Sequence, residues 1–496
     1  MIFNSLTYVL FLIIVSCLYW VLPRGSRLWM LLTASLLFYG FWNFNFIPLL
    51  FVSIVVDFLA ALWVADMPDG WRRNAIMIAA LSINLTILIT FKYLIFIVGQ
   101  AGGLARLLGI DVGTGFSLPF HIVLPLGISF YTFHSMSYTI DVWRRVIPAT
   151  REFVLFANYV VFFPQLVAGP ILRAGEVMWQ LDRRASFAWD NVVAGVRRIM
   201  TGLFLKCVLA DNIAPLVDNG FGNFAPTDLG AIDVVVLAFL FGFQIYFDFA
   251  GYSNIAIGSA RIMGVRFPEN FNFPYLAQNP REFWRRWHIS LSSWVRDYLY
   301  LPLCGLRAGT HSVDGLEVAG RTSTSSLRRT SALWITWTLM GFWHGANWTF
   351  VLWGLWHAAL ISVHRLFAGA AALPATAAWA ITLPLVMLGW IPFRASNLAD
   401  ALAMWGRLVT PSAWVRIGWQ GGSVPVLLTL HRDSYYVAAS VMVLIVGAWA
   451  AERYVLARLE RSPAGLMLAD ATAMAVMTPL VFLFLRPINQ FIYFQF

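Results

Sequence analysis

Apolar residues fill this chain in long runs that short polar segments separate. Crossing about 30 Å of hydrocarbon takes roughly 20 apolar residues in a helix. Runs of about this length lie near residues 5–22, 28–42, 46–65, 74–98, 120–140, 199–216, 232–251, 331–344, 348–364, 374–393, 434–451 and 467–485. The pattern predicts an all-α polytopic membrane protein with about 11–13 spans plus re-entrant or interfacial helices.

Two further apolar segments do not have the pattern of simple spans. Residues 153–170 contain Pro164, Gly169 and Pro170, which interrupt a helix, so we expect a re-entrant piece there. Residues 281–304 are apolar but dense in Arg and Trp. The chain shows no long soluble domain and no internal repeat, and we expect one transmembrane domain over residues 1–496.

Composition supports the membrane class and excludes several others. Of the 496 residues, 60% are apolar and 12% charged, whereas soluble domains average about 45–50% and about 25%. An ordinary cytosolic enzyme, a disordered protein and a coiled coil are therefore excluded. Three widely separated cysteines form no CxxC pair, so neither a disulfide framework nor a metal site is expected.

The net charge of +10 comes almost entirely from Arg. Cytoplasmic loops of membrane proteins carry the excess of basic residues. Placing the Arg-rich loops inside leaves residues 99–119, 217–231 and 394–433 outside. This arrangement predicts a multi-pass membrane protein with both termini outside.

The densest cluster of ionisable residues lies at 281–297, where lipid would make charge expensive. If the segment is one helix, it carries a polar stripe of Arg281, Arg285, His288, Ser292 and Arg296. An aromatic face lies beside the stripe and is formed by Trp284, Trp287, Leu291, Trp294 and Tyr298. Such a helix is either an interfacial anchor or a basic cradle for a phosphate-bearing substrate.

His344 lies within the polar interruption Gly341 to Trp348, between two apolar runs. A buried neutral imidazole can act as a general base, although a lone core histidine is often only hydrogen-bonded to a carbonyl. Asn347 could orient His344 or hold a substrate carbonyl. His357 is a second candidate partner for His344.

Asp248 lies in a third polar island, Gln244 to Asn254, inside a strongly apolar run. It could pair with an Arg of the 281–296 stripe, or it could line a reaction chamber. Lys206 and Asp211 are expected to form a structural pair. The chain lacks HExxH, GxxxxGK[ST] and GxSxG motifs, which disfavours metal-dependent hydrolysis and direct ATP use. The remaining chemistry is histidine-centred acyl transfer or proton coupling.

Two segments, Glu282 to Tyr300 and Gly341 to Trp348, together resemble the membrane-bound O-acyltransferase (MBOAT) family. The resemblance is nearest to the branch that includes the bacterial alginate O-acetylation membrane protein, which implies a location in the bacterial cytoplasmic membrane. It also takes in Leu124–Tyr131, Phe163–Pro170, Tyr246–Asn254 and Trp390–Ala395. The family fold is a ring of tilted helices around a central chamber. The catalytic core would then occupy about residues 120–365.

The resemblance also implies roles for individual residues. His344 matches the catalytic histidine, and His288 matches a second functional position that orients or polarises the thioester carbonyl. From the residue types themselves, we expect substrate contacts from Trp287, Asn347 and Asp248. Candidates for phosphate contacts or structural pairing are Arg281, Arg285, Arg286 and Arg296. The donor would be a cytoplasmic acyl thioester such as acetyl-CoA, with no permanently bound cofactor. The acyl group would reach an extracellular polysaccharide through a periplasmic SGNH-type acetyltransferase, with polysaccharide synthesis and export proteins as further partners and no nucleic acid involved.

The C-terminal tail, residues 486–496, ends in Phe491-Ile492-Tyr493-Phe494-Gln495-Phe496. This hexapeptide resembles the end of the small membrane peptide that partners the MBOAT protein of teichoic acid D-alanylation. The resemblance implies an acyl relay on Tyr493, attacking as a phenolate after His344 takes its proton. An aromatic belt at the membrane interface is the structural alternative.

Three other functions stay open at this point. A D-alanyl or longer-chain acyl transferase would share the same architecture. A proton-coupled transporter would use His344 and Asp248. A non-catalytic scaffold would need neither His288 nor His344.

Overall fold

The computed structural model describes residues 1, 3–110, 122–183, 186–308, 318–319, 325–367, 373–414, 429–451, 462–485 and 492. The regular secondary structure of these residues is almost entirely helical, which confirms the predicted all-α class. The strands that they contain, β1 (Arg307–Ala308) and β2 (Val318–Ala319), form one short antiparallel pair. The chain divides into two compact units, and each is described by itself.

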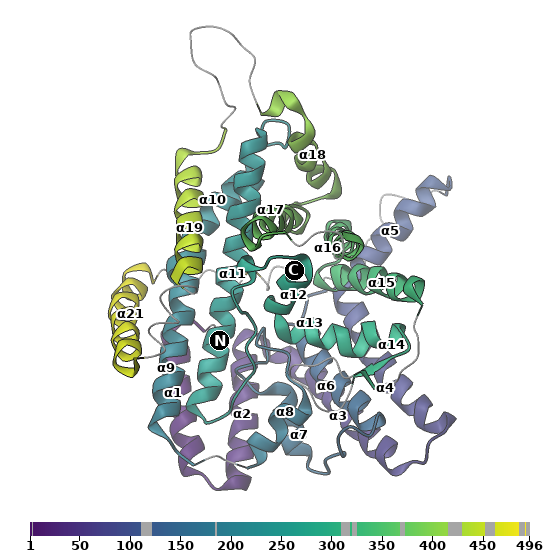
Figure 1. The fold of residues 1–496 in the computed structure, drawn as a ribbon. Coiled ribbons are helices and arrows are strands. Elements are labelled where there is room, and N and C mark those ends of the chain that lie inside the picture. The colour runs from purple at the N-terminus through teal and green to yellow at the C-terminus, as the bar shows by residue number, and fades with distance from the viewer. Residues whose placement is uncertain are drawn as a thin grey trace, which may run out of the picture. The chain divides into compact units, whose positions relative to one another are not determined.

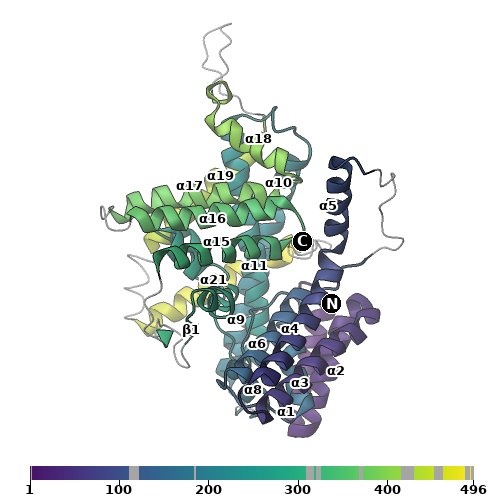
Figure 2. The same cartoon turned by 90° about the vertical axis from the view of Figure 1, so that its right-hand side faces the viewer.

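The first unit contains Met1–Ile199 and Tyr252–Glu269. Its helices are α1 (Leu6–Val21), α2 (Arg24–Asn43), η1 (Phe44–Phe46), α3 (Ile47–Asp66), α4 (Trp71–Lys92), α5 (Leu94–Leu107), α6 (Ile128–Trp143), α7 (Phe153–Val161), α8 (Ala174–Asp182), most of α9 (Trp189–Leu203) and the end of α11 (Ala231–Ile262). Helices α3, α4 and α6 pack against one another (Figures 1 and 2).

A polar network ties these three helices together. The carboxylate of Asp57 on α3 accepts hydrogen bonds from Thr139 Oγ1 of α6 at 2.6 Å and from Asn84 Nδ2 of α4 at 2.8 Å. All three side chains are buried. Because an unpaired buried polar group costs several kcal/mol, this network makes the mutual register of the helices specific.

Residues 153–170 do not form a span-length helix, as the prolines predict. Helix α7 ends at Val161, and an irregular segment follows as far as Arg173. Its residues from Phe162 to Leu172 are all buried. Non-helical backbone is tolerated at membrane depth when protein surrounds it, so this burial fits the predicted re-entrant piece.

The second unit contains Met200–Gly251, Asn270–Ala308 and the described residues after Val318. Besides parts of α9 and α11, its elements are η2 (Phe204–Ala210), α10 (Asp211–Gly222), η3 (Pro274–Leu276), α12 (Pro280–Arg286), α13 (Ile289–Val295), η4 (Arg296–Tyr300), α14 (Leu301–Leu303), α15 (Ser326–His344), α16 (Trp348–Phe367), α17 (Ala375–Arg394), α18 (Leu398–Val409), η5 (Pro411–Ala413), α19 (Arg432–Ala450) and α21 (Pro463–Phe484). Helices α15, α16 and α17 lie side by side (Figures 1 and 2).

Glycines allow the close approach of α15 and α16. A Cβ atom on Gly341 of α15 would overlap the carbonyl oxygen of Phe350, and one on Gly354 of α16 would overlap that of Trp337. Any larger residue would push the two helices apart. The tight hairpin fixes the position of His344, the last residue of α15.

Six helical segments within the described residues are long and apolar enough to cross a membrane. They are Arg24–Asp66, Trp71–Lys92, Ala231–Ile262, Trp348–Phe367, Ala375–Arg394 and Met467–Phe484. The first contains both predicted spans 28–42 and 46–65. Leu6–Val21 and Leu94–Leu107 are shorter apolar helices. The multi-pass character is thus confirmed, while the larger number of spans stays a prediction, as does the single domain over 1–496.

Candidate active site

His288 lies at a break in the chain between α12 and α13. Helix α12 begins with Asn279, whose side chain accepts from the N–H of Glu282 at 2.9 Å, and with Pro280 at its first position. It ends at Arg286, and His288 adopts a left-handed conformation with φ 41° and ψ 56°. The expectation of one continuous helix with a polar stripe over 281–296 is therefore wrong.

The break has a clear physical cause in the preceding loop. The N–H of Asn272 donates to the carbonyl of Arg286, and the N–H of Ile289 donates to the carbonyl of Asn270, both at 2.9 Å. These bonds hold the chain on both sides of His288 in a conformation that a helix does not allow. Sequence periodicity could not reveal them, because their partners lie outside the periodic segment.

The side chain of Asn270 fixes the imidazole of His288. Asn270 Oδ1 lies 3.0 Å from His288 Nδ1, and it accepts from Ser290 Oγ at 2.8 Å and from the Ser290 N–H at 3.3 Å. Because a backbone N–H can only donate, the atom facing His288 is the amide oxygen. His288 Nδ1 must then carry the proton, and Nε2 keeps the lone pair.

The ring of His288 is almost completely buried. The ring of Phe249 meets it edge-on, with 4.5 Å between centroids. Burial lowers the pKa of His288 to about 3, because the cation loses its hydration. The imidazole is consequently neutral at physiological pH.

His344 is buried at the junction of α15 and α16, where its ring lies edge-on to two aromatic rings. The centroid distances are 5.0 Å to Trp353 and 5.1 Å to Phe393. Gly345 ends α15 in an extended conformation, and a Cβ atom there would overlap the ring of Phe350. This glycine is needed for space, not for its backbone angles.

An aromatic layer connects the surroundings of the two histidines. Trp287, which precedes His288, lies 4.9 Å from Trp390, and Trp390 lies 5.4 Å from Phe393, which touches His344. Trp287 and Trp390 are fully buried. The layer excludes water and brings Trp287, which follows α12, together with residues of α15 and α17. Trp287 packs in this layer, and its contact with a substrate stays a prediction.

His357 belongs to the packing of this layer. It is fully buried on α16, and its Nδ1 accepts from Trp284 Nε1 of α12 at 3.3 Å. Its ring also lies 5.1 Å from that of Trp353, which in turn contacts His344. His357 therefore joins α12 to α16, and Trp353 contacts both His357 and His344.

Asp248 forms part of a buried charge cluster. Its carboxylate lies 2.7 Å from Lys206 Nζ, and Lys206 also pairs with Asp211 at 2.8 Å. The Lys206–Asp211 pair is confirmed, whereas the pairing of Asp248 with an Arg of the 281–296 segment is wrong. Asp248 Oδ2 also accepts the backbone N–H of Ile492, in the C-terminal tail, at 2.8 Å.

The remaining candidates are three arginines, Asn347 and Tyr493. Arg281, Arg285 and Arg296 are exposed, and Arg296 pairs with Asp297 at 2.7 Å. The side chain of Asn347 accepts from the Thr349 N–H at 3.1 Å, which caps α16, and donates to the Ser396 carbonyl at 3.1 Å, which ties this cap to the segment after α17. Substrate contacts by these residues stay predictions. Tyr493 lies outside the described residues.

Asn270 is the residue whose role the sequence did not reveal. It lies between Pro268 and Pro274 in a loop rich in aromatic residues, and an asparagine in such a setting was the only available signal. Among the described residues, no group of three or more His, Cys, Asp or Glu could hold a metal ion.

Comparison with known proteins places the chain in a family. The profile of the membrane-bound O-acyltransferase family, MBOAT, matches residues 37–313. A protein described as probable alginate O-acetylase from Azotobacter vinelandii is 38% identical over 424 residues, which are 84% of this chain and 79% of that protein. The Pseudomonas aeruginosa protein of the same description is 38% identical over 84% of this chain and 76% of its own length. The peptidoglycan O-acetyltransferase of Helicobacter pylori is 35% identical over 77% of this chain and 73% of its own length.

Proposed function

This chain belongs to the membrane-bound O-acyltransferase family, and we propose that it moves an acetyl group from a cytoplasmic thioester across the bacterial inner membrane for O-acetylation of an extracellular polysaccharide. Its similarity to proteins described as alginate O-acetylases supports the acetyl group and a polysaccharide acceptor. Acetyl-CoA is the donor. A periplasmic SGNH-type acetyltransferase completes the transfer.

The arrangement around the two histidines supports this chemistry. His344 and His288 are both buried, and the aromatic layer of Trp287, Trp390 and Phe393 connects them. A dry site strengthens hydrogen bonds and keeps water from hydrolysing an activated acyl group. His344 acts as the general base.

Two roles are predicted for His288, orienting the thioester or polarising its carbonyl. The orienting role is favoured. Polarising that oxygen would need an N–H donor at Nε2, the other ring nitrogen. With Nδ1 donating to Asn270, Nε2 is an acceptor. His288 therefore accepts a hydrogen bond, either from the attacking hydroxyl or from an N–H or O–H group of the acyl donor. This bond holds that group in position.

The attachment of the tail to Asp248 is the single observation that carries the relay. Ile492 is buried, and its N–H donates to Asp248. The residue after Asp248, Phe249, packs on the ring of His288. The residue after Ile492 is Tyr493. Ile492, the residue before Tyr493, is thus bound to Asp248, whose neighbour Phe249 contacts His288.

The relay proceeds in two balanced steps. His344 takes the phenolic proton of Tyr493, and the phenolate oxygen attacks the carbonyl carbon of the thioester. The tetrahedral intermediate then breaks its C–S bond, and the thiolate leaves with the proton from His344. The products are an acetyl ester of Tyr493 and free coenzyme A. The ester passes its acetyl group to the periplasmic enzyme.

Mass spectrometry of the C-terminal peptide tests the proposal. Purified protein in proteoliposomes is incubated with acetyl-CoA. We expect an acetyl group on Tyr493, which would raise the mass of the peptide by about 42 Da. Tyr493→Phe should lose the adduct, and Tyr436→Phe, which changes an exposed tyrosine, should keep it. His344→Ala should lower it by about 100-fold or more.

Each alternative has its own outcome. Polymer acetylation that persists in Tyr493→Phe would remove the relay and leave the acyltransferase intact. Acetylation that persists in His344→Ala would remove the catalytic role of that histidine. Labelling by a D-alanyl thioester but not by acetyl-CoA would favour the D-alanyl alternative. Solute uptake that depends on His344 and Asp248 would favour a transporter.

A further inference from the structure

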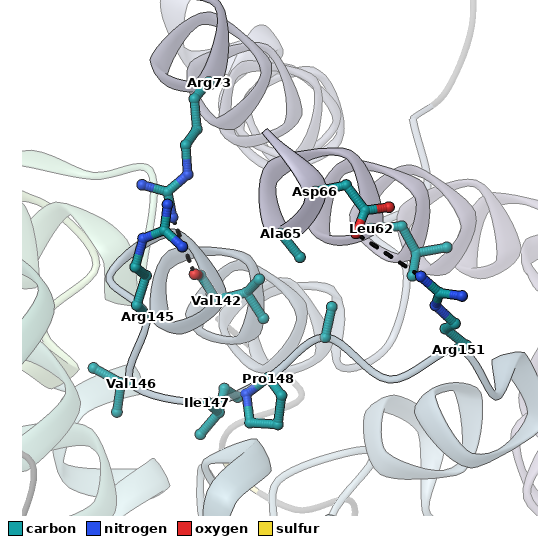
Figure 3. Close-up of a pocket in the computed structure, with 11 residues that line it drawn as sticks. Leu62, Ala65, Asp66, Arg73, Val142, Arg145, Val146, Ile147, Pro148 and Arg151 are labelled. Atoms are coloured by element: carbon teal, nitrogen blue, oxygen red, sulfur yellow. Dashed lines mark hydrogen bonds and ion pairs between the residues drawn. The ribbon is translucent and has the colours of Figure 1, made fainter. Parts of the chain in front are cut away.

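The first unit contains a cavity of about 440 Å³ at the ends of three helices. It lies between the end of α3, the start of α4, and the end of α6 with the segment that follows (Figure 3). Its walls are formed by Leu62, Ala65, Asp66, Arg73, Val142, Arg145, Val146, Ile147, Pro148, Ala149 and Arg151. None of these residues belongs to the candidate active site.

Three guanidinium groups face this cavity. Arg73 is buried and anchored, since its Nε donates to the Val64 carbonyl at 3.0 Å and one terminal nitrogen donates to the Trp143 carbonyl at 2.6 Å. Arg145 has a left-handed backbone with φ 60°. Figure 3 shows Arg73 and Arg145 on one side of the cavity and Arg151 on the other.

Carboxylates neutralise these arginines only in part. Asp69 pairs with Arg73 and, at 3.2 Å, with Arg145. Asp66 lies 3.9 Å from Arg151, and both side chains are more than 70% exposed. An exposed pair at that separation contributes little. Three cations against two anions leave a positive site in which Arg151 and Arg145 are available to a further anion.

The position of the cavity identifies the level of the membrane at which it lies. Helices α3 and α4 are within candidate spans, and the cavity lies where one ends and the other begins. Trp63 and Trp71, on either side of this turn, are 55% and 74% exposed. Exposed Trp at helix ends is typical of the membrane–water interface. The cavity is therefore at the depth of lipid headgroups.

The walls match the two parts of a lipid. Arginines suit a phosphodiester, because guanidinium binds phosphate oxygens with charge-assisted hydrogen bonds. Leu62, Val142 and Ile147 supply apolar surface for the glycerol backbone and the start of the acyl chains. Basic pockets between transmembrane helices commonly bind anionic headgroups.

We propose that this cavity binds the headgroup of an anionic phospholipid, with its phosphate between Arg145 and Arg151. The site is separate from acyl transfer, so it stands or falls independently of the proposed function. The lipid ties the α3–α4 turn to the end of α6. It contributes to stability in the membrane, not to the chemical step.

Native mass spectrometry of delipidated protein tests the proposal. The protein is titrated in detergent with dioleoylphosphatidylglycerol, and bound lipid is counted from the mass of each adduct. The double variant Arg145→Gln/Arg151→Gln should bind this lipid about 10-fold more weakly. Arg72→Gln/Arg144→Gln is the matched control. It also removes two positive charges near the cavity, but neither of the two replaced residues lines it. We expect the control to change affinity by less than about 2-fold.

Two further measurements keep the result interpretable. Arg151→Gln alone changes a side chain that is 83% exposed, so it should fold normally and still weaken binding about 3-fold. Dioleoylphosphatidylcholine should bind about 10-fold more weakly than the anionic lipid. Equal binding of the two lipids, or equal loss in the control pair, would overturn the proposal. Coenzyme A that displaces the lipid from wild type but not from Arg145→Gln/Arg151→Gln would assign the cavity to the donor's phosphates instead.

Discussion

Nδ1 of His288 lies 3.0 Å from Oδ1 of Asn270, eighteen residues earlier in the chain. The same oxygen accepts from Ser290, so one amide fixes both the tautomer of the imidazole and the start of α13. This relationship gives Asn270 a positioning role. It makes the loop before α12 as important to the site as the helices.

We predict that Asn270→Ala lowers the rate of acetyl transfer by about 10-fold to 100-fold. The variant loses the acceptor that holds His288 and leaves buried donors on Ser290 and His288, at a cost of about 1–3 kcal/mol. Asn272→Ala is the matched control, because Asn272 bonds to Arg286 through its backbone atoms. Steady-state kinetics should show the loss in kcat, with KM for acetyl-CoA nearly unchanged. A loss of similar size in Asn272→Ala would contradict the positioning role.

The stability of the protein should fall below pH 6.5 in a way that depends on His288. Its pKa in the folded protein, about 3, lies below the usual value of 6.5. Its contribution is therefore complete above pH 6.5 and is lost as the pH falls, by about 1.4 kcal/mol per pH unit. His288→Asn removes the group, and Asn tolerates a left-handed backbone.

Thermal unfolding in detergent measures this difference. Between pH 7.5 and pH 5.0, wild type should lose about 2 kcal/mol more than His288→Asn. The comparison cancels other titrating groups, because both proteins share them. Parallel losses in the two proteins would mean that His288 is hydrated or already charged.

Replacing Lys206 in the buried charge cluster should destabilise the protein more than breaking an exposed ion pair. Lys206→Met leaves Asp248 and Asp211 buried without their cation, and we expect a loss of about 3–5 kcal/mol. Asp218→Asn breaks the Arg394 pair, in which Asp218 is 61% exposed, and should cost about 1 kcal/mol or less. Chemical unfolding curves of the two variants test this contrast. If Lys206→Met is as stable as Asp218→Asn or more stable, the prediction fails, and the carboxylates of the cluster are in contact with water.

Asp248→Leu tests whether the hydrogen bond to the C-terminal tail matters for acetylation of Tyr493. It leaves the Lys206–Asp211 pair in place and removes the acceptor for the Ile492 N–H. We expect acetylation of Tyr493 to fall by about 10-fold, as for loss of a charge-assisted hydrogen bond. Unchanged labelling, in a variant that remains folded by gel filtration, would show that Ile492 does not position the relay.

Gly345→Ala should reduce activity without unfolding the protein. The new methyl group would overlap the ring of Phe350, which packs 5.0 Å from Phe393, and Phe393 contacts His344. We expect about a 10-fold loss of acetyl transfer, since small displacements of catalytic groups are costly. Phe350→Leu in the same protein should restore part of it. Gly406→Ala, which meets no neighbouring atom, is the control.

Much of the fold could be read from the sequence, because lipid imposes a simple rule. A helix must present apolar side chains to the hydrocarbon and satisfy its own backbone, so the runs at 46–65 and 348–364 correspond closely to α3 and α16. The prolines and glycine of 153–170 correctly predicted that this segment is not a simple span. Periodicity failed at 281–296, where bonds from Asn270 and Asn272 break the helix at His288.

The sequence by itself determined the membrane class and the family, and it singled out His288 and His344 as candidates, since these depend on composition and on short local motifs. Only the tertiary structure decided which groups meet. It paired Asp248 with Lys206 instead of an arginine, attached Ile492 to Asp248, and gave His288 its partner in Asn270. The physical reason is that a buried polar group takes whichever partner the packing of distant segments brings within about 3 Å, and no local pattern records that distance.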